Sequence, residues 1–137
     1  MLLVQLDENP LDNVTIIADD VRPWLKELPE NTLDGAYILF PDPWPKSNHH
    51  KRRIINNALL DLLATAIKPN GILRIATDHV DYSAWIMEHL QAHTEFDWPA
   101  ENHRDWSEPY KDWKQTRYQQ KTTKQGRLPI FLEFIRR

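Results

Sequence analysis

Short apolar runs along the chain predict strands. Residues 13–17 are rich in β-branched side chains, and residues 33–40 are apolar enough to be buried on both faces of a sheet. A third strand is expected at residues 72–77, a short one at 95–98, and a last one, which alternates in part, at 128–135. Longer stretches, in which apolar residues recur at helical spacing, separate these runs. The pattern therefore predicts a mixed α/β protein.

Between these runs, apolar residues recur at helical spacing. The clearest helix is predicted over residues 51–67, and a second amphipathic segment covers residues 82–90. Another helix is expected to begin near Pro23 and to end before Pro29. Residues 99–128 are polar, aromatic and basic without a clear period. The alternation of strand and helix is typical of a doubly wound α/β sheet.

The composition narrows the class of protein. A length of 137 residues fits one domain, residues 1–137. The formal net charge is −3, so a nucleic acid would have to bind a local basic patch. The chain has no cysteine, which excludes disulfides and thiolate metal sites. We expect a soluble, cytoplasmic protein, because no signal peptide is recognised and no run reaches the ~18 apolar residues of a membrane helix.

Three aspartates follow predicted strands, where sheets of this kind bind ligands. Asp20, Asp42 and Asp78 each lie just past the carboxyl end of a strand. In open α/β sheets, ligands bind outside these ends. A single Asp there is more often a turn or helix-cap residue, but three at one edge slightly favour a binding site.

A compact basic segment, "FPDPWPKSNHHKRR", covers residues 40–53. Its prolines fit a rigid turn, and its cations could be the solvated start of a helix. The helix macrodipole, however, disfavours positive charge at a helix start by ~0.3–1 kcal/mol, so the cluster favours a polyanionic ligand. Trp44 fits a core anchor and a base-stacking platform equally well. The residues expected to contact phosphate are Lys46, Lys51, Arg52 and Arg53, with His49 and His50 as further donors.

The string "ILFPDPWPKSNHHKRRI" resembles the signature of the bacterial tRNA guanine-N7 methyltransferases. Three further stretches resemble the same family: "DDVRPWLKELPENTLDGAYILF", "IKPNGILRIATDH", and "TRYQQK" followed by "GRLPIFLEF". The resemblance covers nearly the whole chain from about Asn13. It implies a class I methyltransferase that uses S-adenosylmethionine to methylate a guanine in the tRNA variable loop.

The resemblance also implies roles for particular residues. Asp20 matches the acidic residue at the edge of the cofactor's adenine site. Asp42 matches the active-site aspartate, which lies near both the cofactor and the target base, and no metal is implied. The positions that match substrate or RNA contacts are Lys46, Ser47, Asn48, His49, His50, Lys51, Arg52, Arg53, Asp78, Thr116, Arg117, Tyr118 and Gln119.

Two departures from the family pattern stand out. Gln119 occupies a position where the family usually has Glu, and an uncharged amide would pair less strongly with the N–H edge of guanine. The residues before Asn13 contain no glycine, although the family carries a glycine-rich cofactor loop in its N-terminal part. The sequence is therefore interpreted as N-terminally truncated, and we expect it to bind S-adenosylmethionine weakly or not at all.

The implied sheet has the strand order 3-2-1-4-5-7-6, with helices on both faces and the last strand antiparallel. This chain would supply strands 3 to 7 and lack the first two. The strand at residues 33–40 would then have an open apolar edge, which is a liability for aggregation or strand exchange. We expect either that residues 13–17 pair with this edge, or that a second chain covers it in a homodimer or by strand exchange.

Two functions remain open at this point. The first is a tRNA guanine-N7 methyltransferase, which the intact proline–aspartate–proline–tryptophan string favours. The second is a catalytically incompetent RNA-binding remnant, which the lack of a glycine-rich loop favours for this polypeptide taken alone.

Overall fold

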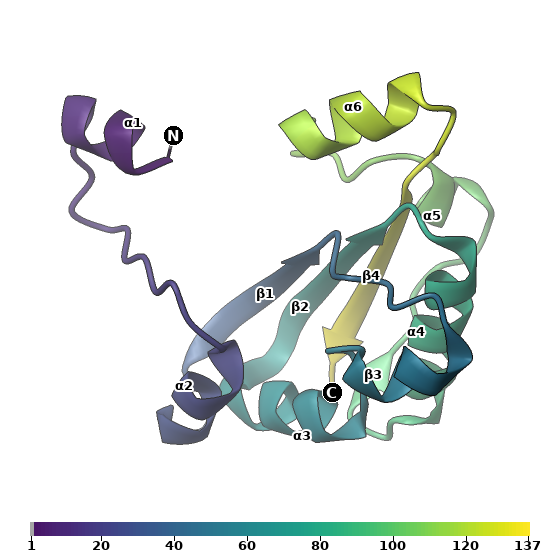
Figure 1. The fold of residues 1–137 in the computed structure, drawn as a ribbon. Coiled ribbons are helices and arrows are strands. Elements are labelled where there is room, and N and C mark those ends of the chain that lie inside the picture. The colour runs from purple at the N-terminus through teal and green to yellow at the C-terminus, as the bar shows by residue number, and fades with distance from the viewer. Residues whose placement is uncertain (1) are drawn as a thin grey trace.

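A four-stranded sheet forms the centre of the molecule (Figure 1), and the computed structural model describes residues 2–137. The strands are β1 (Leu33–Leu39), β2 (Ile67–Thr77), β3 (Phe96–Asp97) and β4 (Ile130–Arg136). The helices are α1 (Leu2–Glu8), α2 (Val21–Glu27), α3 (Asn57–Ala66), α4 (Val80–Ala92), α5 (Arg104–Ser107) and α6 (Arg117–Lys124), with a 3₁₀ helix η1 (Ser47–Arg52) after β1.

The strands lie in the order β1-β2-β4-β3. β1 and β2 are parallel, whereas β4 runs antiparallel to both β2 and β3. This order corresponds to strands 4-5-7-6 of the implied sheet, so the predicted mixed α/β class and the antiparallel last strand are confirmed. Gly35 allows β1 and β2 to approach closely, because a Cβ there would lie 2.8 Å from the carbonyl oxygen of Ile72.

The two faces of the sheet are covered unequally. On one face, Leu73 and Ile75 of β2 belong to the main core, together with apolar residues of α2, α3 and α4. On the other face, Ala76 and Phe131 are covered by Tyr110 and Trp113, which lie in the irregular segment before α6. Arg74 ties that segment to the sheet through Asp112, Glu133 and Tyr37. The side with α3 and α4 therefore carries most of the buried apolar surface.

The predicted strand at residues 13–17 is wrong. These residues form no strand, and Val14, Ile16 and Ile17 are 44%, 41% and 51% exposed. They belong to an extended segment that leads away from the sheet to α1 (Figure 1). β-Branched residues favour a strand only when a neighbouring strand can pair with them. Within residues 2–137, the outer edge of β1 pairs with no other strand, so the expected pairing of residues 13–17 with β1 is also wrong.

The predicted helix at residues 51–67 is shorter and divided. Residues 47–52 form the 3₁₀ helix η1, and α3 begins only at Asn57. Asn56 caps α3, because its side-chain oxygen accepts a hydrogen bond from the Leu59 N–H at 3.0 Å. The break lies at Arg53, whose side chain turns into the protein.

Among the described residues, no helix has both the length and the apolar character needed to cross a membrane.

Candidate RNA-binding and active site

The loop after β1 places Asp42 at the carboxyl edge of the sheet. Phe40 and Trp44, on either side of the loop, have φ angles of 51° and 40°, a region that bulky residues rarely adopt. Pro41 and Pro43 lie between these two residues, and the ring of each proline fixes its own φ angle. The Phe40 N–H donates to the carbonyl of Ala76 at 2.7 Å, which extends the pairing of β1 with β2 by one residue. Strained backbone of this kind persists only where the surroundings hold it.

Arg53 is the residue that holds this loop. Its side chain is 1% exposed; its Nε donates to the carbonyl oxygen of Pro43 at 2.8 Å and its Nη2 to Asp81 Oδ2 at 2.6 Å. The guanidinium lies 4.9 Å from the ring centre of Tyr82 and 5.1 Å from that of Trp85. The loop is therefore fixed to the first turns of α4, and we call this set of contacts the Arg53 clamp.

The electrostatics of the clamp follow from its contacts. The hydrogen bond from Arg53 lowers the pKa of Asp81 below its ordinary value of 3.8, with a smaller contribution from the charge of Arg53. Burial raises the pKa of Tyr82, and the negative charge of Asp42 raises it further. Asp42 itself is exposed, and its Oδ1 accepts from the Trp44 N–H at 3.4 Å. Asp42 is thus an available carboxylate next to a rigid, buried support.

The clamp corrects the role expected for Arg53. A buried guanidinium that already donates to a carbonyl and a carboxylate cannot neutralise an RNA phosphate, so the predicted phosphate contact of Arg53 is wrong. No local pattern distinguishes Arg53 from Arg52, because its partners lie 10 and 28 residues away in the chain. Arg52, by contrast, is exposed.

The other predicted basic residues lie on η1 and at its start. Arg52 stacks over the ring of Trp44 at 5.0 Å, and His49 meets the same ring edge-on at 5.8 Å. His50 is half-buried against Trp85, so it is less accessible than Lys51 and Arg52. Trp44 is half-buried and already in contact with Arg52, so it supports η1 rather than the main core. The exposed residues of this segment are Lys46, Ser47, Asn48, Lys51 and Arg52.

Asp78 follows β2 at the same edge of the sheet as Asp42. Its side chain is 8% exposed, and it accepts from the Tyr118 hydroxyl at 3.3 Å and faces Arg127 Nε at 3.5 Å. The ring of Tyr118 also lies 4.9 Å from that of Phe40. Burial and the charge of Asp78 raise the pKa of Tyr118. These contacts hold α6 over the carboxyl ends of β1 and β2, where Figure 1 shows it.

Thr116 and Gln119 order the start of α6. The Thr116 hydroxyl caps the helix by accepting from the Gln119 N–H at 3.1 Å. The side chain of Gln119 is buried, and its Oε1 accepts from Trp113 Nε1 at 2.8 Å. The indole N–H of Trp113 can only donate, so the amide oxygen of Gln119 must face it. The NH₂ group of Gln119 is therefore on the side of the amide away from Trp113. Arg117 and Tyr118 lie on the exposed side.

Asp20 plays a local role. It is the N-cap of α2, and its carboxylate binds the Arg22 side chain at distances of 2.5 to 3.1 Å. The hydrogen bonds from Arg22 lower the pKa of Asp20 to about 2. Its recorded partners all belong to its own turn and α2, so the structure does not join Asp20 to Asp42 and Asp78.

Three supporting residues escaped the sequence analysis: Asp81, Tyr82 and Trp85. The Tyr82 hydroxyl accepts from the Ile55 N–H at 3.2 Å, and Trp85 Nε1 donates to the Ile55 carbonyl at 2.7 Å. Tyr82 and Trp85 lie at positions i and i+3 of α4, so they share one side of the helix, and this spacing is the signal in the sequence that could have found them.

Neither a metal site nor a complete cofactor site is built from these residues. In the described part of the chain, no group of His, Asp and Glu side chains could hold a metal ion. A Cβ on Gly35 or Gly71 would meet the protein's own atoms, and Gly126 follows α6, so these three glycines form no cradle for a phosphate or nucleoside. The residues present do not fit a complete S-adenosylmethionine site.

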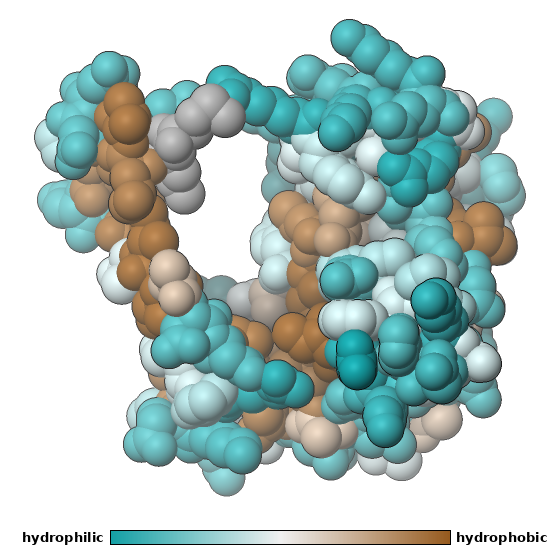
Figure 2. Space-filling view, viewed as in Figure 1, coloured by the Kyte–Doolittle hydropathy of each residue, from teal (hydrophilic) through white to brown (hydrophobic). Residues whose placement is uncertain are grey.

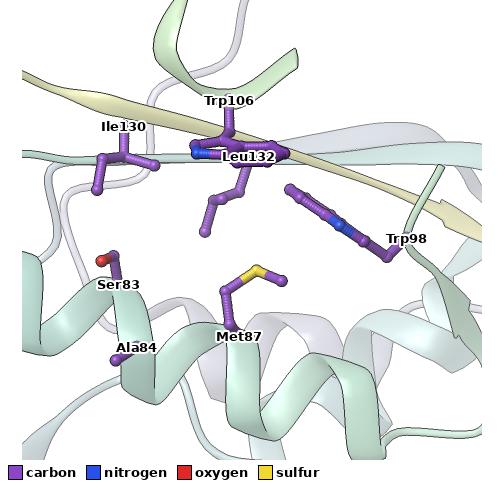
Figure 3. A pocket seen from close by; sticks show the side chains of 7 residues that line it. All are labelled: Ser83, Ala84, Met87, Trp98, Trp106, Ile130 and Leu132. Atoms are coloured by element: carbon purple, nitrogen blue, oxygen red, sulfur yellow. The ribbon is translucent and has the colours of Figure 1, made fainter. Parts of the chain in front are cut away.

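A separate pocket of about 240 Å³ lies between α4 and β4 (Figure 3). Trp98 and Trp106 line one side, with ring centres 6.1 Å apart, and Met87 lies opposite. The only hydroxyl in its wall, that of Ser83, already donates to the Val80 carbonyl at 2.6 Å. No charged side chain lines this pocket, so it does not resemble a phosphate or nucleoside site.

The fold is that of a methyltransferase. A solved structure of a SAM-dependent O-methyltransferase from Thermotoga maritima superposes with a TM-score of 0.51 and 14% identity, covering 97% of this chain and 43% of that one. The model of the family described as "Putative methyltransferase" matches residues 1–132, and the chain belongs to this methyltransferase family.

Curated relatives are similar over nearly the whole chain. The tRNA (guanine-N(7)-)-methyltransferase of Rhodospirillum rubrum is 43% identical over 135 residues, which are 98% of this chain and 53% of that protein. The proteins of the same name from Roseobacter denitrificans and Azorhizobium caulinodans are 40% and 41% identical, each covered over 58% of its length. The chain thus spans little more than half the length of the relatives it matches.

Proposed function

We propose that this chain forms the substrate-binding part of a tRNA guanine-N7 methyltransferase, which transfers a methyl group from S-adenosylmethionine to a variable-loop guanine in the cytoplasm. The observation that carries the proposal is the exposed Asp42 carboxylate, which lies at the same edge of the sheet as Asp78, in a loop that the Arg53 clamp fixes. A rigid carboxylate at the carboxyl edge of the sheet suits the recognition of a flat, hydrogen-bonding base.

Asp42 orients the target base in this proposal. The N1–H and the exocyclic amine of guanine are adjacent donors, and a carboxylate can accept from both. This pairing occupies one edge of the base and leaves N7, on the opposite edge, free. Guanine N7 carries a lone pair and no proton, so methylation there needs no general base. The protein's task is alignment, and the charge of Asp42 would offset the positive charge that develops on the purine.

The exposed residues of η1 and of the turn before it would hold the RNA backbone. Lys46, Lys51 and Arg52 supply cations, while Ser47 and Asn48 supply hydrogen-bond donors, with the half-buried His49 as a further donor. On the α6 side of the site, Asp78, Thr116 and Gln119 would make the remaining contacts with the substrate. A homodimer or strand exchange that covers the open edge of β1 is part of the same proposal, because Tyr37 and Leu39 are 54% and 41% exposed there.

The decisive experiment replaces Asp42. In a full-length relative, the change that corresponds to Asp42→Ala should reduce turnover far more than tRNA affinity, because the carboxylate aligns one base while many contacts bind the RNA. Asp34→Ala is the matched control, since Asp34 is an exposed aspartate at the opposite end of β1. Equal losses of turnover and affinity for the Asp42 variant would contradict the alignment role.

A second candidate is RNA binding without catalysis by this polypeptide alone. The three glycines favour it, because none of them forms a cofactor cradle. Calorimetric titration of the chain with S-adenosylmethionine separates the two candidates, and we expect weak binding or none. Tight binding together with methyl transfer to tRNA would reject the second candidate.

A further inference from the structure

The outward side of α6 carries a row of cations. Arg117, Lys121 and Lys124 are exposed and recur at positions i, i+4 and i+7, which fall on one side of a helix. The opposite side is buried through Gln119 and Thr122. The helix therefore packs on the protein through Gln119 and Thr122, and its two lysines, Lys121 and Lys124, face solvent.

This part of the chain is basic, although the whole chain is acidic. Residues 111–127 contain six cationic side chains and one aspartate, a charge of +5, so the remaining residues carry −8 of the total of −3. The single aspartate, Asp112, is already paired with Arg74 at 2.9 Å. The positive charge of this segment is therefore not compensated from within it.

The helix itself explains only part of this charge. Cations in the last turn are favoured by the macrodipole, which applies to both Lys121 and Lys124 but not to Lys114, which lies before the helix. Like charges three or four positions apart repel each other, however, and ion pairs would normally relieve them. None of the ion pairs formed within residues 2–137 involves Lys114, Lys121 or Lys124. The arrangement suits a polyanion outside the chain.

The position of α6 indicates which polyanion. Tyr118 packs against Phe40 and Asp78, so α6 lies over the same edge of the sheet as Asp42. η1 lies lower, in front of α4, and the loop with Asp42 runs between the two elements (Figure 1). The upper right of Figure 2, over α6, is strongly hydrophilic. Two cationic elements thus lie on either side of the proposed base-binding carboxylate.

We propose that Lys121 and Lys124, with Lys114 beside them, form a second phosphate-binding surface for the RNA whose base reaches Asp42. One RNA molecule then contacts η1 and α6 at the same time. The inference rests on the proposed RNA substrate but not on catalysis, because it needs only RNA binding.

The test measures the affinity of this chain for unmodified tRNA by fluorescence anisotropy at several salt concentrations. K121E/K124E should raise the Kd at least about 10-fold and reduce the slope of log K against log salt by about 1.4–1.8, the value for two lost phosphate contacts. K26E/K68E changes the net charge equally on other surfaces and should raise the Kd less than about 2-fold. Equal effects of the two double variants would overturn the proposal.

Two further variants test the parts of this proposal separately. K121Q/K124Q removes the charges without placing acids in the last turn, so a circular dichroism spectrum like that of the parent chain shows that α6 is intact. Combining K121Q/K124Q with K51E/R52E should add the two changes in log Kd if one RNA spans both surfaces. Small single effects with a large combined loss would indicate alternative binding modes and overturn the single-RNA contact.

The outcome is distinguishable from that of the proposed function. If the Asp42 experiment fails and the α6 effect persists, the chain binds RNA without the proposed alignment. If methyl transfer by a relative depends on Asp42 and the α6 variants bind tRNA normally, only this inference fails.

Discussion

η1 and α6 bring cations to the same edge of the sheet, yet they are fixed in different ways. η1 ends at Arg53, a buried charge that donates to a backbone carbonyl and to Asp81. α6 is held by the Trp113–Gln119 hydrogen bond and by the contacts of Tyr118 with Phe40 and with the Asp78 carboxylate, and the donors of both hydrogen bonds are neutral. Removing a buried charged donor costs more than removing a neutral one, so we expect the two elements to differ in their sensitivity to mutation.

Within one basic run of the sequence, one arginine is available for binding and the next supports the loop. Arg52 and Arg53 are adjacent, but one side chain is exposed and the other is 1% exposed. The exposed arginine is available to a ligand, whereas the buried one determines where the loop lies. A basic run therefore contains two functions that composition alone does not separate.

The largest effect is expected for Arg53→Ala. The change removes two hydrogen bonds from a charged donor and the contacts with two aromatic rings, so the free energy of unfolding should fall by about 2–3 kcal/mol. The value is below that of a fully buried pair because Asp81 is 62% exposed. Urea denaturation measures it. Arg52→Ala is the control: it should weaken RNA binding while changing stability by less than about 0.5 kcal/mol. Similar losses of stability in both variants would refute the clamp.

A smaller effect is expected for Gln119→Glu. One carboxylate oxygen can still accept from Trp113, and the other replaces the NH₂ group with an acceptor. The affinity for an RNA with guanine at the target position should rise by about 1 kcal/mol, because a charged acceptor binds the N–H edge more strongly. Gln120→Glu, an exposed neighbour, should not do so. A weaker affinity of the Gln119 variant would mean that the NH₂ group donates to the substrate instead.

Tyr118→Phe should have an effect below about 0.5 kcal/mol on stability. The lost hydrogen bond to Asp78 is long, at 3.3 Å, whereas the ring contact with Phe40 remains. Thermal unfolding of the variant measures the change. A loss of several kcal/mol would show that α6 depends on this one hydroxyl.

The smallest expected effect is the loss, at acid pH, of the stability that Asp81 contributes to the Arg53 clamp. The pKa of Asp81 is lowered in the folded protein, so its contribution is complete above its ordinary value of 3.8 and is lost as the pH falls through the lowered value. The difference in melting temperature between the parent chain and Asp81→Asn should therefore be constant from pH 7 to about 4 and shrink below that. Since Asp81 is largely exposed, the difference should be small throughout.

The parts of the fold that depend on local pattern were predictable. Continuous apolar runs gave β1 and β2, and the prolines marked α2. Residues 13–17 have the composition of a strand, but a strand exists only where a partner strand pairs with it, and composition does not show this. The division of residues 47–66 at Arg53 depends on contacts with α4, which are remote in sequence.

The candidate site was predictable to a similar degree. The position of Asp42 and Asp78 at one edge follows from the order of the strands. The burial of Arg53 and the pairing of Trp113 with Gln119 depend on tertiary contacts, so no spacing rule gives them.

The antiparallel strand β4 implies an order of events during folding. β2 pairs with β1 across about 35 residues, for example Tyr37 with Arg74, whereas it pairs with β4 across about 60, as Arg74 does with Glu133. Closing the longer loop costs more chain entropy, so β1, α3 and β2 should assemble before β4 arrives. In that interval the central strand β2 has one unpaired edge. The rate at which β4 docks should then decide how much of the chain folds and how much aggregates, and pulsed hydrogen exchange would show β2 amides next to β4 protected last.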